Sequence, residues 1–301
     1  MNYTRDLFGI LFSGEIEGKY MGTMYGGYID DSADRNRERV VVSAVIIGNY
    51  RDWGYLTKQW RKRLKKAEIE YFKSSHCNHL RGQFFKFRSV EQYPPPKGRE
   101  AADGVRADLD KIIKKSKAVG VGVVIPIPLF RKLKSESQYS CLIPNDPYHW
   151  AVQSVWDESR KAVSKVGREN TITFAHDDGS NFHVLHDLFL AYKGKNPDAA
   201  RVLRDFVPLD DKTNPPIQAA NAVADVTFRY AEEWATNPTR ENMRRLRGNM
   251  YKVCVWDEDY ARENLEQMVR SQYSAEKNQA ETGNQPQNAA NNAGIIHTIP
   301  Q

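Results

Sequence analysis

The sequence predicts an α/β fold in which helices are layered on a β-sheet, and three observations predict it. Short β-branched and aromatic segments alternate with amphipathic helical segments along most of the 301 residues, an order typical of layered α/β domains. Residues 119–127 form a nearly continuous apolar run, which is typical of a strand covered on both faces. The chain is also long enough to bury a large core within one domain that carries insertions.

The elements follow from local patterns in chain order. Residues 25–30 and 40–47 are expected to pair as a hairpin across a polar turn. Trp53, Leu56, Trp60 and Leu64 recur at helical spacing and predict an amphipathic helix that ends near Lys66. The same signals predict a helix over 99–117, a strand over 119–127, a helix over 150–163, a strand over 171–175, a helix over 183–192, a strand over 201–207 and a helix from Pro215 to about Trp234.

The two ends of the chain differ in pattern from this central part. Residues 1–23 have no clear periodicity and are interpreted as an N-terminal extension, whereas residues 24–273 are expected to form the domain. From about Ser274 the composition changes to Gln, Asn, Ala and Gly. Such a segment cannot bury enough apolar surface to offset the cost of ordering, so residues 274–301 are predicted to be a disordered tail.

Composition narrows the classes of function. No apolar run approaches the roughly 20 residues that a membrane span requires, so we expect no membrane partner. The three cysteines are far apart, which argues against a disulfide framework and favours the reducing cytoplasm. The net charge of +6 permits binding of a polyanion such as nucleic acid. The chain has no phosphate-cradling glycine loop and no dinucleotide fingerprint.

Four acidic residues are the candidate catalytic residues, because each ends an apolar segment or lies inside one: Asp30, Glu70, Asp177 and Asp225. A buried carboxylate is costly unless a cation compensates it. Carboxylate oxygens suit hard ions such as Mg²⁺ or Mn²⁺. Two such ions about 4 Å apart stabilise the attacking and leaving oxygens of phosphodiester cleavage. The pattern therefore predicts a shared metal site.

Each acid also has a structural explanation. Asp30 and Asp177 each begin an Asp-Asp pair after a strand, where turn chemistry favours Asp. A salt bridge or a capping bond would explain Asp225 among the alanines of its helix. Glu68 is an alternative to Glu70, and either would be unexceptional as a surface acid. His176, next to Asp177, would either tune the metal site or cap the strand end.

Basic residues gather on one side of the first predicted helix and just after it. The candidate nucleic-acid-binding residues are Lys58, Arg61, Lys62, Lys65 and Lys73. A groove that follows a phosphate backbone would give salt-dependent affinity. A solvated helix face explains the four residues on the helix equally well, and a plain surface lysine explains Lys73.

The pattern resembles the domain of unknown function 3800 family, which is grouped with the ribonuclease H-like superfamily. The resemblance rests on Tyr-Ile-Asp-Asp-Ser at 28–32, where the family usually reads Asp-Glu-Ser-Gly, and is supported by four further segments: 41–47, 70–73, 175–179 and 217–225. The family's last helix typically reads Leu-Gln-hydrophobic-Ala-Asp, so the spacing from Gln218 to Asp225 is wider than usual. Glu70 follows only two predicted strands, whereas in ribonuclease H the acidic helix follows three.

The resemblance implies a ribonuclease H-like mixed sheet flanked by helices, with helical insertions. It also implies a metal-dependent nuclease that hydrolyses RNA or DNA. In this interpretation Asp30, Asp177 and Asp225 bind Mg²⁺ or Mn²⁺, and Glu70 is a fourth ligand or orients the water. The alternative is a non-catalytic module of the same fold that binds nucleic acid or protein. Hydrolysis of a small phosphoester or nucleotide is a third possibility.

Overall fold

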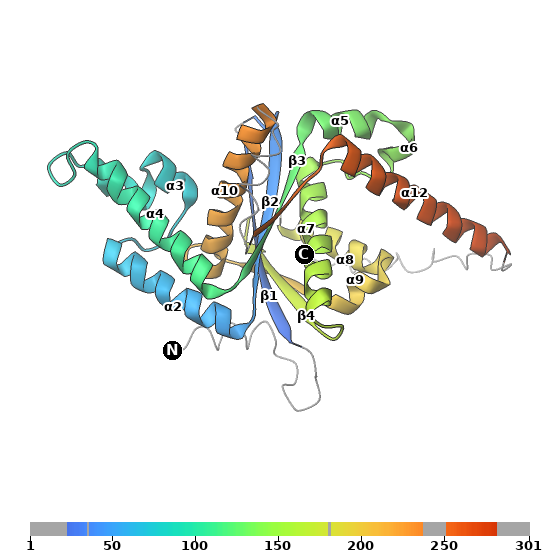
Figure 1. Ribbon diagram of the computed structural model, residues 1–301, viewed down its shortest axis with the longest axis horizontal. Helices are drawn as coiled ribbons and strands as arrows, with labels where there is room; N and C mark the ends of the chain where they lie inside the picture. Colours follow the sequence, from blue (N-terminus) through green and yellow to red (C-terminus); the bar gives the residue numbers. More distant parts are fainter. Residues whose placement is uncertain (1–22, 35, 180–181, 237–250, 282–301) are drawn as a thin grey trace, which may run out of the picture.

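A mixed sheet of six strands organises the computed structural model, which describes residues 23–34, 36–179, 182–236 and 251–281 (Figure 1). The strands are β1 (Met24–Ala33), β2 (Val40–Gly48), β3 (Val119–Pro126), β4 (Thr171–Asp177), β5 (Leu203–Leu209) and β6 (Tyr251–Val255). Their order in the sheet is β5-β4-β1-β2-β3-β6. β1, β2 and β3 are antiparallel neighbours, whereas β4 and β5 continue parallel to β1, and β6 is parallel to β3.

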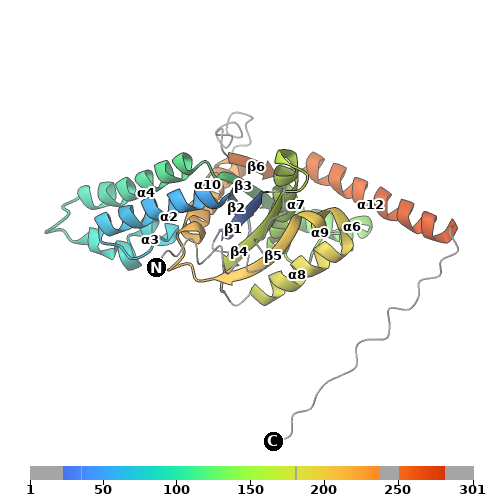
Figure 2. The same ribbon diagram turned by 90° about the horizontal axis from the view of Figure 1, so that it is seen from below.

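Helices cover both faces of this sheet, so the predicted α/β fold is confirmed (Figures 1 and 2). The layer on one face contains α2 (Tyr50–Ala67), α3 (Ser74–His79), the short 3₁₀ helix η1 (Gly82–Arg88), α4 (Lys97–Ser116) and α10 (Pro215–Thr236). The layer on the other face contains α5 (Ile127–Ser135), α6 (Ser137–Ser140), α7 (Pro147–Val166), α8 (Phe182–Lys195), α9 (Pro197–Val202) and α12 (Glu258–Glu281).

Alternation along β1 divides its side chains between two apolar cores. Tyr28 belongs to the core under α2 and α10, where its ring meets Trp53 edge to face at 4.7 Å between centroids. Ile29 points into the opposite core. Gly27 is required here, because a Cβ at that position would lie 2.7 Å from the ring of Phe174. The absence of a side chain at Gly27 therefore lets the Phe174 side chain of β4 pack closely against β1.

Local signals set the helix starts. Asn49 caps α2 in a capping box with Asp52, whose carboxylate accepts the Asn49 N–H at 2.9 Å. Asp146 caps α7, and Pro147 takes its first turn. Pro215 likewise opens α10, as the sequence predicts. These caps satisfy amide groups that have no partner within the helix.

The expected hairpin is confirmed by the antiparallel register of β1 and β2, in which Asp30 lies opposite Ala44. Strand β6 and helix α12 were not predicted. α12 continues to Glu281, so residues 274–281, expected in a disordered tail, are helical. Residues 1–22 of the expected extension and 282–301 of the expected tail lie outside the described residues. In the described part of the chain, every helix is too short or too polar to cross a membrane.

Candidate functional site

Three parallel strands bring pairs of aspartates to one edge of the sheet. β1, β4 and β5 are neighbours that run in the same direction, so their carboxyl ends meet at the same edge. The ladder between β1 and β4 ends at Ile29 and His176, and the next residues are Asp30 and Asp177. Asp210 and Asp211 follow the last residue of β5. In open α/β sheets this is the edge where ligands bind.

Strand alternation decides which face each aspartate uses. Tyr28 and Ala175 both belong to the core under α10, and a side chain two residues further along a strand points to the same face. Asp30 and Asp177 therefore lie on the α10 face as neighbours across the two strands. Asp31 and His176 point to the opposite face, towards α7.

The negative charge of the buried Asp30 carboxylate is only partly compensated by its hydrogen-bond donors and by the nearest cation. Burial raises its pKa to about 7, and the negative charge of Asp31 adds to this effect. Hydrogen bonds from the Asp31 N–H, at 2.8 Å, and from the Asn221 side chain oppose the rise, as does the positive charge of Lys73. The raised pKa shows that these three contacts do not offset the loss of hydration. An additional cation at Asp30 would be favourable.

Asp177 and Asp211 share the same neighbourhood with Lys73. Burial raises the pKa of Asp177, and the charge of Asp211 raises it further. The ammonium of Lys73 lies 3.1 Å from Oδ2 of Asp211. Burial lowers the pKa of Lys73, but Asp211, with smaller effects from Asp30 and Asp177, outweighs burial and raises it above its ordinary value. Three carboxylates and one ammonium thus interact at this edge.

Gln218, at the start of α10, fixes the two segments that carry Lys73 and Asp211. Its Oε1 accepts the Phe72 N–H at 3.0 Å and the indole N–H of Trp60 at 2.8 Å. Its Nε2 donates to the carbonyl of Asp211 at 2.9 Å. The side chain is almost fully buried, so each of these bonds is strong compared with one exposed to water.

Asn221, one turn later on α10, connects the same segment to Asp30. Its Oδ1 accepts the Ser74 N–H at 2.7 Å, and its side chain also hydrogen-bonds Asp30. Helix α10 packs on β1 and β2, which brings this amide to the strand end. Asn221 is therefore the residue of α10 that faces the candidate site.

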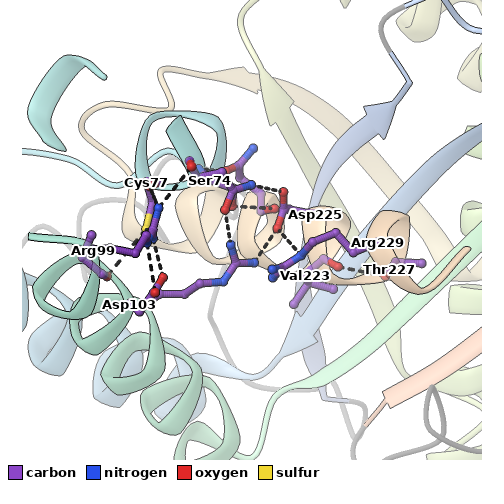
Figure 3. Close-up of polar contacts among 12 residues, drawn as sticks. Ser74, Cys77, Arg99, Asp103, Val223, Asp225, Thr227 and Arg229 are labelled. Carbon is purple, nitrogen blue, oxygen red and sulfur yellow. Dashed lines mark hydrogen bonds and ion pairs between the residues drawn. The ribbon is translucent and has the colours of Figure 1, made fainter. Parts of the chain in front are cut away.

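Asp225 lies a further turn along α10 and is held in an ion-pair network (Figure 3). Its carboxylate pairs with Arg106 of α4 and accepts Nε of Arg229 at 3.2 Å. Asn78 of α3 donates to its other oxygen at 2.8 Å. The salt bridge, which was the alternative explanation of this residue, is thus what the structure shows. Protein donors thus contact both oxygens of the carboxylate that the sequence analysis predicts as a metal ligand.

Glu70 and Glu68 both face solvent. Glu70 exchanges hydrogen bonds with Gln83, at 3.2 Å from its N–H and 3.3 Å to its carboxylate. Glu68 lies near Lys86 instead. The structure brings Asp30, Asp177 and Lys73 together, but it places Glu70 on the surface beside η1.

On the opposite face of the same edge, Tyr148 of α7 links Asp31 to His176. Its hydroxyl lies 2.7 Å from Nε2 of His176 and also hydrogen-bonds Asp31. Nδ1 of His176 lies 3.0 Å from the carbonyl of Asp177. Burial raises the pKa of Asp31 although His176, Arg37 and Tyr148 act against it. This network holds the main chain at Asp177 from the α7 face of the sheet. His176 therefore stabilises the end of β4.

The remaining basic candidates lie on the outer face of α2. Lys58, Arg61, Lys62 and Lys65 are exposed, and the chain runs from the end of α2 directly to Lys73. α2 is in the same layer as α10 (Figure 2). The basic face and the strand-end aspartates therefore share one side of the sheet.

Sequence reasoning missed Asp211, Asn221 and Tyr148, and it named Gln218 only as part of the helix motif that carries the resemblance. The Asp-Asp pair at 210–211 was a usable signal, because it repeats the pattern at β1 and β4. Within residues 23–34, 36–179, 182–236 and 251–281, no three His, Cys, Asp or Glu side chains stand in an arrangement that would hold a metal ion.

Comparison with models of known protein families gave no match, and a search of the curated proteins gave none either.

Proposed function

We propose that this protein is a metal-dependent nuclease with a ribonuclease H-like fold, which hydrolyses phosphodiester bonds of a nucleic acid. The observation that carries the proposal is that Asp30 and Asp177 are neighbours on two parallel strands, with Asp211 following the adjacent parallel strand at the same end. Burial raises the pKa of Asp30 and that of Asp177, and the charge of Asp211 raises the pKa of Asp177 further, which indicates a place where positive charge is lacking.

The sheet supports the proposed fold. β1 is central, with the antiparallel strands β2 and β3 on one side and the parallel strands β4 and β5 on the other. This mixed sheet between helical layers agrees with what the resemblance implies. Because one fold carries many functions, the activity is argued from the aspartates and not from the fold.

The donor set fits a hard divalent ion. Asp30 and Asp177 offer oxygen ligands on neighbouring strands, which Mg²⁺ and Mn²⁺ prefer. Asp30 and Asp177 would hold the ion, and Asn221 would orient Asp30 through its hydrogen bond. A bound ion supplies a Lewis acid and a water of lowered pKa. In this proposal Asp225 does not bind the ion but stabilises the packing of α10 against α3 and α4. Its carboxylate contacts Arg106, Arg229 and Asn78.

The basic face of α2 supports a polyanionic substrate. Lys58, Arg61, Lys62 and Lys65 would contact phosphates along a strand, and their contribution would weaken as salt rises. Lys73 stands beside the aspartates and would contact the phosphate at the reacting position. We place this activity in the cytoplasm, because none of the three cysteines forms a disulfide.

The proposal is tested by incubating the metal-free protein with labelled RNA, DNA and RNA–DNA hybrid, with and without Mn²⁺. We expect Mn²⁺-dependent cleavage that falls at least about 100-fold in Asp30→Asn and in Asp177→Asn, because each substitution removes a ligand of the ion. Asp178→Asn is the matched control, since its side chain is exposed next to Asp177. Cleavage that survives both ligand substitutions would assign the activity to another place or to a contaminant.

A specific observation favours a second candidate, a non-catalytic nucleic-acid-binding module of the same fold. Asn221, an amide, is the group that α10 presents to Asp30, while the acid of that helix, Asp225, is neutralised by arginines. An amide is a weaker ligand for a divalent ion than a carboxylate. Calorimetry that shows nucleic-acid binding without Mn²⁺ binding would select the module over the nuclease.

A further inference from the structure

One face of α2 carries a stripe of exposed basic side chains around a tyrosine. Residues three or four positions apart lie on the same face of a helix. The basic stripe consists of six exposed residues that recur at this spacing: Arg51, Tyr55, Lys58, Lys62, Lys65 and Lys66. Trp53, Trp60 and Leu64, which pack into the core, lie on the opposite face. The basic stripe therefore points directly away from the core.

The fold leaves most of the positive charge of this stripe uncompensated. Lys58 and Lys62 are four residues apart, a spacing at which like charges destabilise a helix. The acid of α2, Asp52, uses its carboxylate in the helix cap. Among the described residues, none of the five cations of the stripe forms an ion pair, whereas Arg63, on the flank of α2, pairs with Asp108. A polyanion bound along the stripe would supply the missing negative charge.

The stripe runs towards the edge of the sheet that carries the aspartates. α2 begins at the opposite edge, because Gly48, two residues before it, pairs with the start of β1. After α2 the chain leads to Lys73, which pairs with Asp211. From Arg51 to Lys66 the helix rises about 22 Å at about 1.5 Å per residue. This length corresponds to about six nucleotides of a stacked strand, at about 3.4 Å each.

Further lysines lie beside the start of the stripe. α4 packs beside α2 (Figure 1) and ends with the exposed Lys114, Lys115 and Lys117. The strand that follows α4 begins opposite the end of β2, with Val119 paired to Ile47. The end of α4 therefore lies near the start of α2, and the positive charge continues from one helix onto the other.

Tyr55 places an aromatic ring among these charges. The residue is 37% exposed, with Arg51 one turn before it and Lys58 one turn after it. An exposed ring stacks on a base whose face is free, as in a single strand, whereas the bases of a duplex are stacked on one another. The cations on both sides of the ring can hold the phosphates that flank a stacked base.

We propose that the basic stripe binds a single-stranded nucleic acid, with Tyr55 stacked on one base and the cations of α2 against the phosphates. This inference rests on the proposed function, in which the substrate is a nucleic acid. It adds that the bound strand is single and that about six of its nucleotides lie along α2.

The test is fluorescence anisotropy of labelled oligonucleotides with the full chain in EDTA, so that no metal-dependent cleavage occurs. Single strands of increasing length are compared with a duplex that contains the longest of them. We expect the affinity for single strands to rise steeply up to about eight nucleotides and only weakly beyond. The duplex should bind several-fold more weakly than the single strand of the same sequence.

Tyr55→Ala tests the stacking. This variant should bind the single strand about tenfold more weakly than the wild type, because one stacked base is lost. Tyr55→Phe is the matched control, since it keeps the ring, and its affinity should stay within about twofold of the wild type. An unchanged affinity in Tyr55→Ala, or equal losses in the two variants, would overturn the stacking and with it the preference for a single strand. Circular dichroism melting verifies that each variant is folded.

Lys58→Gln combined with Lys65→Gln tests the phosphate contacts. The slope of log affinity against log salt should become shallower by about 1.4, at about 0.7 for each phosphate contact of a single strand. Lys165→Gln combined with Lys195→Gln is the matched control, since it removes the same charge from exposed positions of α7 and α8. Equal changes of slope in the two double variants would overturn the assignment to α2.

The remaining outcomes separate this inference from the proposed function. The expected binding without Mn²⁺-dependent cleavage of any nucleic acid supports the single-strand surface and removes the nuclease activity. Cleavage together with binding that no substitution in the stripe changes, or with tighter binding of the duplex, overturns this inference and leaves the nuclease proposal intact. Binding to phosphatidylserine vesicles without binding to any oligonucleotide overturns it in favour of a lipid surface. Absence of both oligonucleotide binding and cleavage overturns both proposals.

Discussion

Arg106→Met should destabilise the protein strongly, because it leaves the Asp225 carboxylate in the interior without its main partner. The side chains of Arg106 and Asp225 are only 9% and 12% exposed. Arg106 also donates to Oδ1 of Asn78 at 2.7 Å, so one guanidinium joins α4 to both α3 and α10. Methionine fills much of the space of arginine without its charge, which limits the effect to the lost ion pair and hydrogen bond.

The structure sets the size of the expected effect. Opposite unit charges about 3 Å apart attract by roughly 5 kcal/mol at an effective dielectric constant of about 20. In the intact protein, desolvation of both ions offsets much of that attraction. In the variant Asp225 keeps its desolvation cost and retains Asn78 and Arg229, but the Arg229 side chain is 51% exposed and compensates only in part. Breaking a buried pair typically costs 3–5 kcal/mol, so we expect about 3 kcal/mol here.

The assay is urea unfolding followed by circular dichroism, with the free energy of unfolding obtained by linear extrapolation. Arg63→Met is the matched control, because Arg63 pairs with Asp108 at 2.9 Å while Asp108 is 45% exposed. That variant should lose less than about 1 kcal/mol. In a double-mutant cycle, Arg106→Met with Asp225→Asn should cost about 2 kcal/mol less than the sum of the two single variants. Additive losses, or equal losses in Arg106→Met and Arg63→Met, would refute the reasoning.

Three further predictions concern the strand-end aspartates and the basic helix. The folded state holds a proton on Asp30 up to about pH 7, whereas the unfolded chain releases it near pH 4, so stability falls as the pH rises through that window. In metal-free protein, Asp30→Asn should therefore gain stability over the wild type from pH 4 to pH 7 in urea unfolding, and a constant difference would contradict the raised pKa. Asn221→Asp adds a carboxylate beside Asp30, so this variant should bind Mn²⁺ about tenfold more tightly in calorimetry. Without metal it should melt at a lower temperature than the wild type. Unchanged Mn²⁺ affinity would show that α10 does not face the ion. Lys62→Glu should lower nucleic-acid affinity several-fold at low salt and make that affinity less dependent on salt, as measured by fluorescence anisotropy. The control Lys165→Glu, on the exposed side of α7, should leave the affinity unchanged. Equal losses of affinity in the two variants would indicate a general response to net charge.

Much of the fold could be predicted from the sequence, because its signals are local. The spacing of Trp53, Leu56 and Trp60 predicts α2, and the apolar run of 119–127 predicts β3. β6 gave no such signal, since its five residues pair only with β3, which is about 130 residues earlier in the chain. α12 was missed because its apolar face is sparse: within residues 258–270, the part of the helix whose burial is described, only Ala261 and Leu265 are buried.

The site was predicted in part. Asp30 and Asp177 were predicted because each begins an Asp-Asp pair after an apolar segment, a pattern that is present in the sequence itself. Asp225 was chosen because an acid among alanines needs a partner, and that reasoning was sound, but the partner is Arg106. Arg106 lies more than 100 residues away in sequence, and no local pattern relates the two positions.

By itself, the sequence determined which residues form strands and helices, since side-chain periodicity and caps act over a few residues. It also determined that a pair of aspartates lies near the carboxyl end of each of β1, β4 and β5. Only the tertiary structure decided which of them share a site. The parallel register and the strand face bring Asp30 and Asp177 together, whereas the packing of α10 turns Asn221 towards them and Asp225 towards the arginines. Such a choice depends on how separate elements pack, because one helical turn changes the groups that a side chain can reach.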